Sequence, residues 1–349
     1  MIGAGHTRRQ RRRDIDPVGQ PTLPDHDASP NRSSPRSGQR RLATLTGTVP
    51  PASILLDFDP ILRLGDSGVR LETLGLTAAV LVALLIAAYL AGRTPPDHSH
   101  PGWAREDEHL RRDDLLFIVL GVVPGAVVGG RIGYVLLHAD YYAVHQPAIL
   151  DAGQGSLELG LAIVIGTITG VYVARLLDAP VGRWLHVASV PVLAALGLGK
   201  VAMALGGSGQ GAPSDSPLAT AYAGTGPWGS LAPAIPAHPA QLYEAAATGI
   251  ALGFLVLLLS LGAFRSRDGS AYFIGLALWA IGRFVVTFAW RDDAVVGPVR
   301  AGGLIALGVA ATAILGVAAA RWAGSRARHQ AHLTAQDPEW PDPASRPPF

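Results

Sequence analysis

The sequence contains no cysteine and carries few charges. Without cysteine the chain can form no disulfide, no thiolate metal site and no cysteine nucleophile. Charged residues make up 15% of the chain, whereas a soluble domain carries about a quarter. Lysine is nearly missing as well, because Lys200 is the single lysine among 349 residues. Together with a mean hydropathy of +0.30, these shortages argue against an ordinary soluble enzyme.

The charges that are present gather at the two ends of the chain. Residues 1–53 contain nine arginines, four aspartates and seven prolines without a periodic apolar pattern, and residues 321–349 are similarly polar and proline-rich. Such segments bury too little apolar surface to offset the cost of ordering, so we predict that both tails are disordered. The run "RRQRRRD" is interpreted as a solvated extension, and we expect no nucleic-acid partner.

Between the tails, seven apolar segments have the length needed to cross a bilayer. We place them at 73–91, 115–137, 158–177, 187–206, 245–263, 271–290 and 302–320. Lipid cannot satisfy backbone N–H and C=O groups, so segments this long and continuous are expected to be helices. The sequence therefore predicts an all-α polytopic membrane protein, with a bundle of seven transmembrane helices over residues 54–320.

Basic residues in the short loops predict the direction of the spans. They follow the first, third, fifth and seventh spans, as Arg93, Arg105, Arg111, Arg112, Arg175, Arg183, Arg265, Arg267, Arg321, Arg326 and Arg328. The opposite loops at 138–156 and 207–244 contain no lysine or arginine, and the last opposite loop contains Arg291 and Arg300. This pattern places the C-terminus in the cytoplasm and the N-terminus outside.

Ionisable residues inside membrane spans are costly, and each one is a candidate for function. Here they are Arg131, Glu158, Lys200, Glu244 and Arg283. One interpretation is internal pairing that only fixes helix packing, for example Arg131 with Glu244. The other is a cationic pocket for a lipid phosphate, since arginine offers a planar fork to phosphate oxygens. We expect no metal, because His138 and His145 lack helical ligand spacing.

Several motifs resemble one family, the prolipoprotein diacylglyceryl transferases. They are "LDFDPILRLGDSGVRLETLGL" (56–76), "GAVVGGRIGYVLLHADYY" (125–142), "HPAQLYEA" (238–245) and "GLALWAIGRFVVTFAWRDD" (275–293). Their order, their spacing and the seven spans agree over about residues 54–320. "GGRIGYV" and "HPxQLYE" are the most specific of these motifs.

The resemblance implies transfer of the diacylglyceryl group of phosphatidylglycerol to the lipobox cysteine of a preprolipoprotein. Glycerol phosphate leaves, at the outer face of the bacterial inner membrane and without a cofactor. By position, Arg283 matches the arginine that the family uses at its phosphate. The substrate-binding candidates come from the shared motifs and are Gly130, Arg131, His238, Gln241, Tyr243 and Glu244.

The sequence departs from the family pattern at positions implied in activating the thiol. In "GKVAMALGGS" (199–208), Lys200 replaces an arginine, Met203 and Gly206 replace two asparagines, and Ser208 replaces an acid. In "SLELG" (156–160), Glu158 replaces a histidine. Trp279, Thr287 and Leu74 also differ from the pattern. The catalytic candidates are therefore Arg283, Glu158 and Lys200, with Glu158 orienting or deprotonating the cysteine. The alternative is an inactive paralogue that binds anionic phospholipid or preprolipoprotein.

A transporter is a third interpretation of seven spans with buried charges. Secondary transporters are commonly built from inverted repeats with interrupted helices. The sequence has no apparent inverted repeat and no pair of broken spans, so this interpretation is disfavoured.

Overall fold

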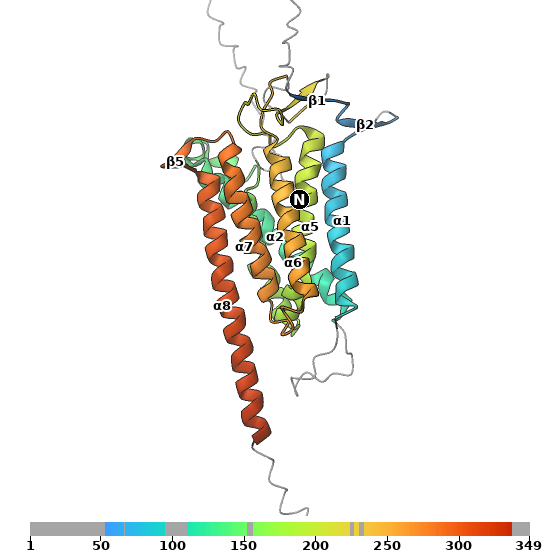
Figure 1. Ribbon diagram of the computed structural model, residues 1–349, viewed down its shortest axis with the longest axis vertical. Coiled ribbons are helices and arrows are strands. Elements are labelled where there is room, and N and C mark those ends of the chain that lie inside the picture. The colour runs from blue at the N-terminus through green and yellow to red at the C-terminus, as the bar shows by residue number, and fades with distance from the viewer. Residues whose placement is uncertain are drawn as a thin grey trace, which may run out of the picture. The chain divides into compact units, whose positions relative to one another are not determined.

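The computed structural model describes residues 53–65, 67–94, 110–151, 156–223, 227–229 and 234–336. Within them, seven long helices stand side by side as a bundle (Figure 1). They are α1 (Leu71–Ala91), α2 (Arg112–Leu137), α4 (Leu159–Leu176), α5 (Val181–Gly206), α6 (Ala240–Ser260), α7 (Ser270–Val286) and α8 (Ala301–Gln336). Each is long and apolar enough to cross a membrane. All seven predicted spans are confirmed, and the chain is a multi-pass membrane protein.

The sides of the bundle carry large apolar residues that no other part of the chain covers. Leu85, Leu116, Ile250 and Leu315 are 60–74% exposed. In water, a continuous apolar surface of this kind would drive association. In a bilayer the same side chains contact acyl chains, so this surface is a lipid-facing belt.

A row of glycines on α2 allows α4 to pack closely against it. Gly121, Gly125, Gly129 and Gly133 recur every four residues and face α4, where a Cβ on Gly129 would lie 2.6 Å from the Cβ of Ile165. Small residues at this spacing are typical of helix contacts in membranes. The glycines around Arg131 therefore serve helix packing.

A buried apolar core lies between α5, α6 and α7. Leu193, Leu255 and Trp279 are at most 2% exposed, and Ala313 of α8 closes the same cluster. Trp279 of this core lies one turn from Arg283 on α7. The packed core therefore fixes the position of the buried charges described below.

Short strands and helices lie between the spans, and the sequence analysis did not predict them. β1 (Ile54–Asp57) pairs in parallel with β4 (Thr220–Ala223), while two hairpins join β2 (Ile61–Leu64) to β3 (Ser67–Arg70) and β5 (Ala294–Val296) to β6 (Val299–Arg300). The short helices are α3 (Ala139–Val144), η2 (Gln146–Ile149) and η3 (Thr287–Ala289). β1, β2 and β5 lie at one end of the bundle (Figure 1).

Helix α8 extends beyond the end predicted for the seventh span. The sequence predicted a disordered tail from residue 321, whereas α8 continues to Gln336 and runs past the ends of its neighbours (Figure 1). Alanine, arginine and glutamine favour helix, and the first proline after the span is Pro338. Residues 1–52 and 337–349 lie outside the described residues, and their disorder stays a prediction.

Candidate active site

Four buried charges from four different helices form one connected chain of ion pairs. Arg283 on α7 donates from Nη1 to Glu244 Oε1 on α6. Lys200 Nζ on α5 lies 3.1 Å from Glu244 Oε2, and Arg283 Nη2 lies 3.6 Å from Glu158 Oε1 at the start of α4. Two cations thus meet two carboxylates, so the cluster is formally neutral. We call these four residues the ion chain.

Burial explains why the four charges pair. Glu244 is fully buried, and the side chains of Glu158, Lys200 and Arg283 are 4–12% exposed. A charge without a counter-charge in such a place is strongly destabilising. The sequence had raised internal pairing as one interpretation, and the structure shows such pairing among these four.

Arg131 is not part of the ion chain. Its guanidinium donates to the carbonyl oxygens of Ile149 at 2.7 Å, Ala148 at 2.5 Å and Asp151 at 3.1 Å. In the described part of the chain no ion pair joins it to Glu158 or Glu244, so the suggested Arg131–Glu244 pair does not form. Arg131 instead holds the loop after α3 against α2.

Glu158 acts as the N-terminal cap of α4. Its Oε1 accepts from the backbone N–H of Gly160 at 2.8 Å, and its Oε2 accepts from Leu161 at 2.7 Å. Its own N–H donates to the carbonyl oxygen of Gly130 at 2.8 Å. The positive end of a helix stabilises a carboxylate in this position. Glu158 is therefore fixed in place before any ligand arrives.

Several buried polar atoms on α6 and α7 have no hydrogen-bond partner. They are Arg283 Nε, Gln241 Oε1 and Trp279 Nε1, judged against the residues that the structure describes. The guanidinium lies 5.6 Å from the centre of the Trp279 ring. Buried polar groups are nearly always paired, so these unpaired atoms on the two helices that carry Glu244 and Arg283 indicate room for a polar ligand.

Gln241 and Tyr222 connect the site to the long loop before α6. Gln241 Nε2 donates to the Tyr222 hydroxyl at 3.2 Å, and that hydroxyl donates to the carbonyl oxygen of Ala204 at 2.8 Å. Burial raises the pKa of Tyr222, so its phenol is protonated at neutral pH and acts as a donor. The loop before α6 is thus tied to the helix that carries Glu244.

His238 and Tyr243 lie at the rim of the site and not in the ion chain. His238 Nδ1 is 3.4 Å from the Tyr243 hydroxyl, and both residues are partly exposed. The backbone carbonyl of His238 accepts from the N–H of Gly211 at 2.7 Å. The residues of the motif "HPAQLYE" thus have three different places. His238 and Tyr243 lie at the rim, Gln241 contacts the loop, and Glu244 is a buried charge.

Two contacts at this end were missed by sequence reasoning. Ser208, which stands where the family pattern has an acid, donates to Glu72 Oε2 on α1 at 2.8 Å. A carboxylate therefore does lie beside this end of α5, but it comes from another helix. Arg291 donates from Nε and Nη2 to the carbonyl oxygen of Gln210 at 3.1 and 3.0 Å. No short sequence pattern predicts either contact, because the two partners are 136 and 81 positions apart.

The family model that matches this chain and the relatives named below agree in their descriptions. Residues 60–319 match the family model described as prolipoprotein diacylglyceryl transferase. A relative from Geobacter sulfurreducens, named phosphatidylglycerol–prolipoprotein diacylglyceryl transferase, is 29% identical over 244 residues, which are 69% of this chain and 85% of the relative. Relatives of the same name from Brucella anthropi and Brucella canis are 29% identical over 262 and 265 residues, each match covering 74% of this chain and 89% of the relative.

Proposed function

Because the chain belongs to the prolipoprotein diacylglyceryl transferase family, we propose that it transfers diacylglyceryl from phosphatidylglycerol to the cysteine of a prolipoprotein. The observation that carries this assignment is the buried Arg283: neither its own Nε nor the Nε1 of neighbouring Trp279 has a hydrogen-bond partner among the described residues. Arg283 lies within the residues that match the family model. A packing residue alone would have no need of such neighbours.

The reaction joins the cysteine sulfur to a glyceryl carbon. The S–C bond forms while the bond from that carbon to the phosphate oxygen breaks, and the electron pair stays on the departing glycerol phosphate. The thiol proton is released to water or to that phosphate. A thiolate is needed because the thiol is a poor nucleophile, and nearby cations lower a thiol's pKa.

Arg283 and Lys200 are the groups that we assign to the phosphate. Cations already in place where charge develops stabilise a leaving anion without reorganisation. Arg283 can offer its Nε and the remaining guanidinium protons, and Lys200 adds a point charge that lies 5.3 Å from the ring centre of Trp290. Glu244 pairs with both cations and so keeps them in the same region.

Glu158 is assigned to positioning and not to proton transfer. Both of its oxygens already accept hydrogen bonds from the start of α4, and Oε1 also faces Arg283. Arg131 keeps a supporting role at the outer loop, and His238 with Tyr243 forms the rim that the prolipoprotein peptide meets first.

The orientation that we propose places the ion chain toward the outer face of a bacterial inner membrane. Glu158 and Glu244 lie at the N-terminal ends of α4 and α6, next to loops without basic residues. The arginine-rich loops lie at the opposite ends of these helices, which is the cytoplasmic side by the basic-residue rule. A phosphatase fused after Arg321 should be inactive, and full activity there would reverse this orientation.

Activity is tested by lipidation of a prolipoprotein by the full chain in vesicles that contain phosphatidylglycerol. Wild-type protein should attach diacylglyceryl to the cysteine, and Arg283→Ala should not. Glu158→Gln keeps an oxygen that can cap α4 but removes the charge facing Arg283. We expect a lower kcat with an unchanged shape of the pH profile, whereas loss of the acid limb would identify Glu158 as the base.

A binding protein without catalysis is the second candidate. The observation in its favour is that the ion chain is formally neutral and that Glu158 is already engaged as a helix cap. Failure of well-folded wild-type protein to lipidate any prolipoprotein, with phosphatidylglycerol still bound, would leave this second function standing.

A further inference from the structure

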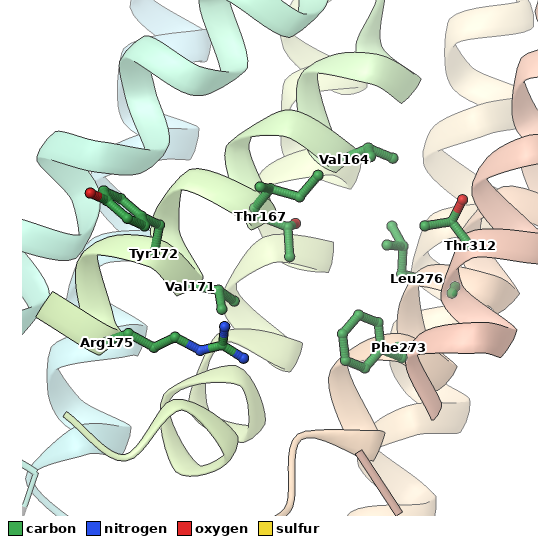
Figure 2. Close-up of a pocket in the computed structure, with 10 residues that line it drawn as sticks. Val164, Thr167, Val171, Tyr172, Arg175, Phe273, Leu276 and Thr312 are labelled. Atoms are coloured by element: carbon green, nitrogen blue, oxygen red, sulfur yellow. The ribbon is translucent and has the colours of Figure 1, made fainter. Parts of the chain in front are cut away.

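An apolar groove lies between α4 on one side and α7 with α8 on the other. Its cavity has a volume of about 350 Å³, and Figure 2 shows Val164, Thr167 and Val171 facing Phe273, Leu276 and Thr312 across it. Leu276 is buried in its floor, while Ile168 and Tyr172 on its edge are 58% and 61% exposed. The groove therefore opens sideways, toward the hydrocarbon of the membrane.

The polar groups in its wall are already satisfied by the protein. The Thr167 hydroxyl donates to the Ile163 carbonyl at 2.7 Å and lies 2.6 Å from the Tyr272 hydroxyl. The Thr312 hydroxyl donates to the Gly308 carbonyl at 2.8 Å. Water needs two to four polar partners to stay in a cavity, and these two hydroxyls already use their protons within the protein. The groove is suited to a hydrocarbon chain.

One cation stands at one end of this apolar groove. Arg175, in the last turn of α4, extends its guanidinium toward the side of Phe273 (Figure 2). Its side chain makes no hydrogen bond or ion pair with any residue in the ranges that the structure describes. An exposed guanidinium at a membrane surface is well placed to bind a phosphate through two N–H groups.

The length of the groove matches one leaflet. Eleven residues separate Val164 from Arg175, which corresponds to about 16 Å of helix at 1.5 Å per residue. The hydrocarbon core of a bilayer is about 30 Å thick, so the groove reaches from one face to about the midplane. Glu158 lies about 25 Å from Arg175 by the same rise, near the other face. The groove is thus distinct from the ion chain.

We propose that this groove binds one acyl chain of an anionic phospholipid from the leaflet on the Arg175 side, with the lipid phosphate on Arg175. The chain fills the space between α4 and the α7–α8 pair, which protein side chains leave open. The proposal does not depend on the transferase activity, because the lipid is bound at the membrane face opposite the ion chain.

Binding is tested by native mass spectrometry of the purified full chain with phosphatidic acid, in an Arg283→Ala background that weakens the proposed outer phosphate site. Arg175→Gln should lower the affinity for one phosphatidic acid by about fivefold, the effect of one surface arginine on an anionic lipid. Arg265→Gln removes an exposed charge from the same end and should have no such effect. Equal binding by both variants would overturn the proposal, as would equal retention of phosphatidylcholine.

A second variant tests the apolar part of the groove. Val171→Phe fills it and should also displace the lipid, whereas Ile250→Phe enlarges a lipid-facing residue elsewhere and should not. A phosphatidic acid with a photoreactive group in mid-chain should label peptides of α4. If Val171→Phe reduces transferase activity while Arg175→Gln leaves lipid binding unchanged, the groove holds a substrate chain from the other leaflet and the proposal is wrong.

Discussion

The two ends of the bundle are built from the same helices but by different means. At the end with the ion chain, α4, α5, α6 and α7 meet through Glu158, Lys200, Glu244 and Arg283, and a buried network of hydrogen bonds ties loops to helices. At the other end, α4 faces α7 and α8 across an apolar groove, and the nearest charge is an exposed arginine. The difference shows that the groups able to bind a phosphate are concentrated where the protein buries charge. The other half of the bundle is held by apolar packing and faces lipid.

Removing Glu244, the carboxylate that pairs with both cations, should have the largest effect on stability. Glu244→Ala leaves Lys200 and Arg283 buried without their common partner, which costs about 3–5 kcal/mol of unfolding free energy. The measurement is unfolding in mixed micelles. Asp178→Asn, at the exposed opposite end, serves as the control and should be close to wild type. Equal stability of the two variants would mean that the ion chain is not formed in the membrane.

The next effect is on catalysis. Arg283→Ala should reduce the rate of prolipoprotein lipidation by about a hundredfold or more, the usual cost of losing one preorganised charge-stabilising donor. Arg265→Ala removes an arginine at the other end and should retain the wild-type rate. A rate for Arg283→Ala within a factor of about two of wild type would remove Arg283 from the proposed mechanism, since one donor is normally worth far more than that.

Packing within the membrane gives a smaller effect that does not depend on charge. A Cβ at Gly125 would overlap the side chain of Thr169 on α4, so Gly125→Ala should destabilise the fold by about 1–3 kcal/mol. A methyl group added at Gly249 on α6 would meet no neighbouring atom within 4 Å, and Gly249→Ala should be neutral or slightly stabilising. If both variants unfold alike, the glycine row does not set the distance between α2 and α4.

The smallest effect is expected from a single hydrogen bond in the wall of the groove. Thr167→Val breaks the contact with the Tyr272 hydroxyl and should cost about 0.6 kcal/mol, the average for such bonds between membrane helices. Thr312→Val breaks only a bond within its own helix and should cost less. The comparison is made by the same micelle unfolding, and a larger loss for Thr312→Val would contradict the expected order.

The membrane architecture follows from the amino-acid order alone. Seven uninterrupted apolar segments cannot satisfy their backbone groups in lipid except as helices, so their number and approximate limits follow from composition and length. Shared motifs also pointed to the family, and the cost of burying charge marked the four residues of the ion chain as special. These are local properties, which a linear sequence displays directly.

Which charges meet depends instead on the three-dimensional packing. Arg131 was expected to join the phosphate site, but it lies against loop carbonyls, while Arg283 pairs with both carboxylates. The parallel pairing of β1 with β4 and the contact of Glu72 with Ser208 were likewise invisible beforehand. Each of these contacts depends on how helices rotate and approach one another. That rotation is set by the sum of many packing contacts across the bundle, and no single stretch of sequence carries it.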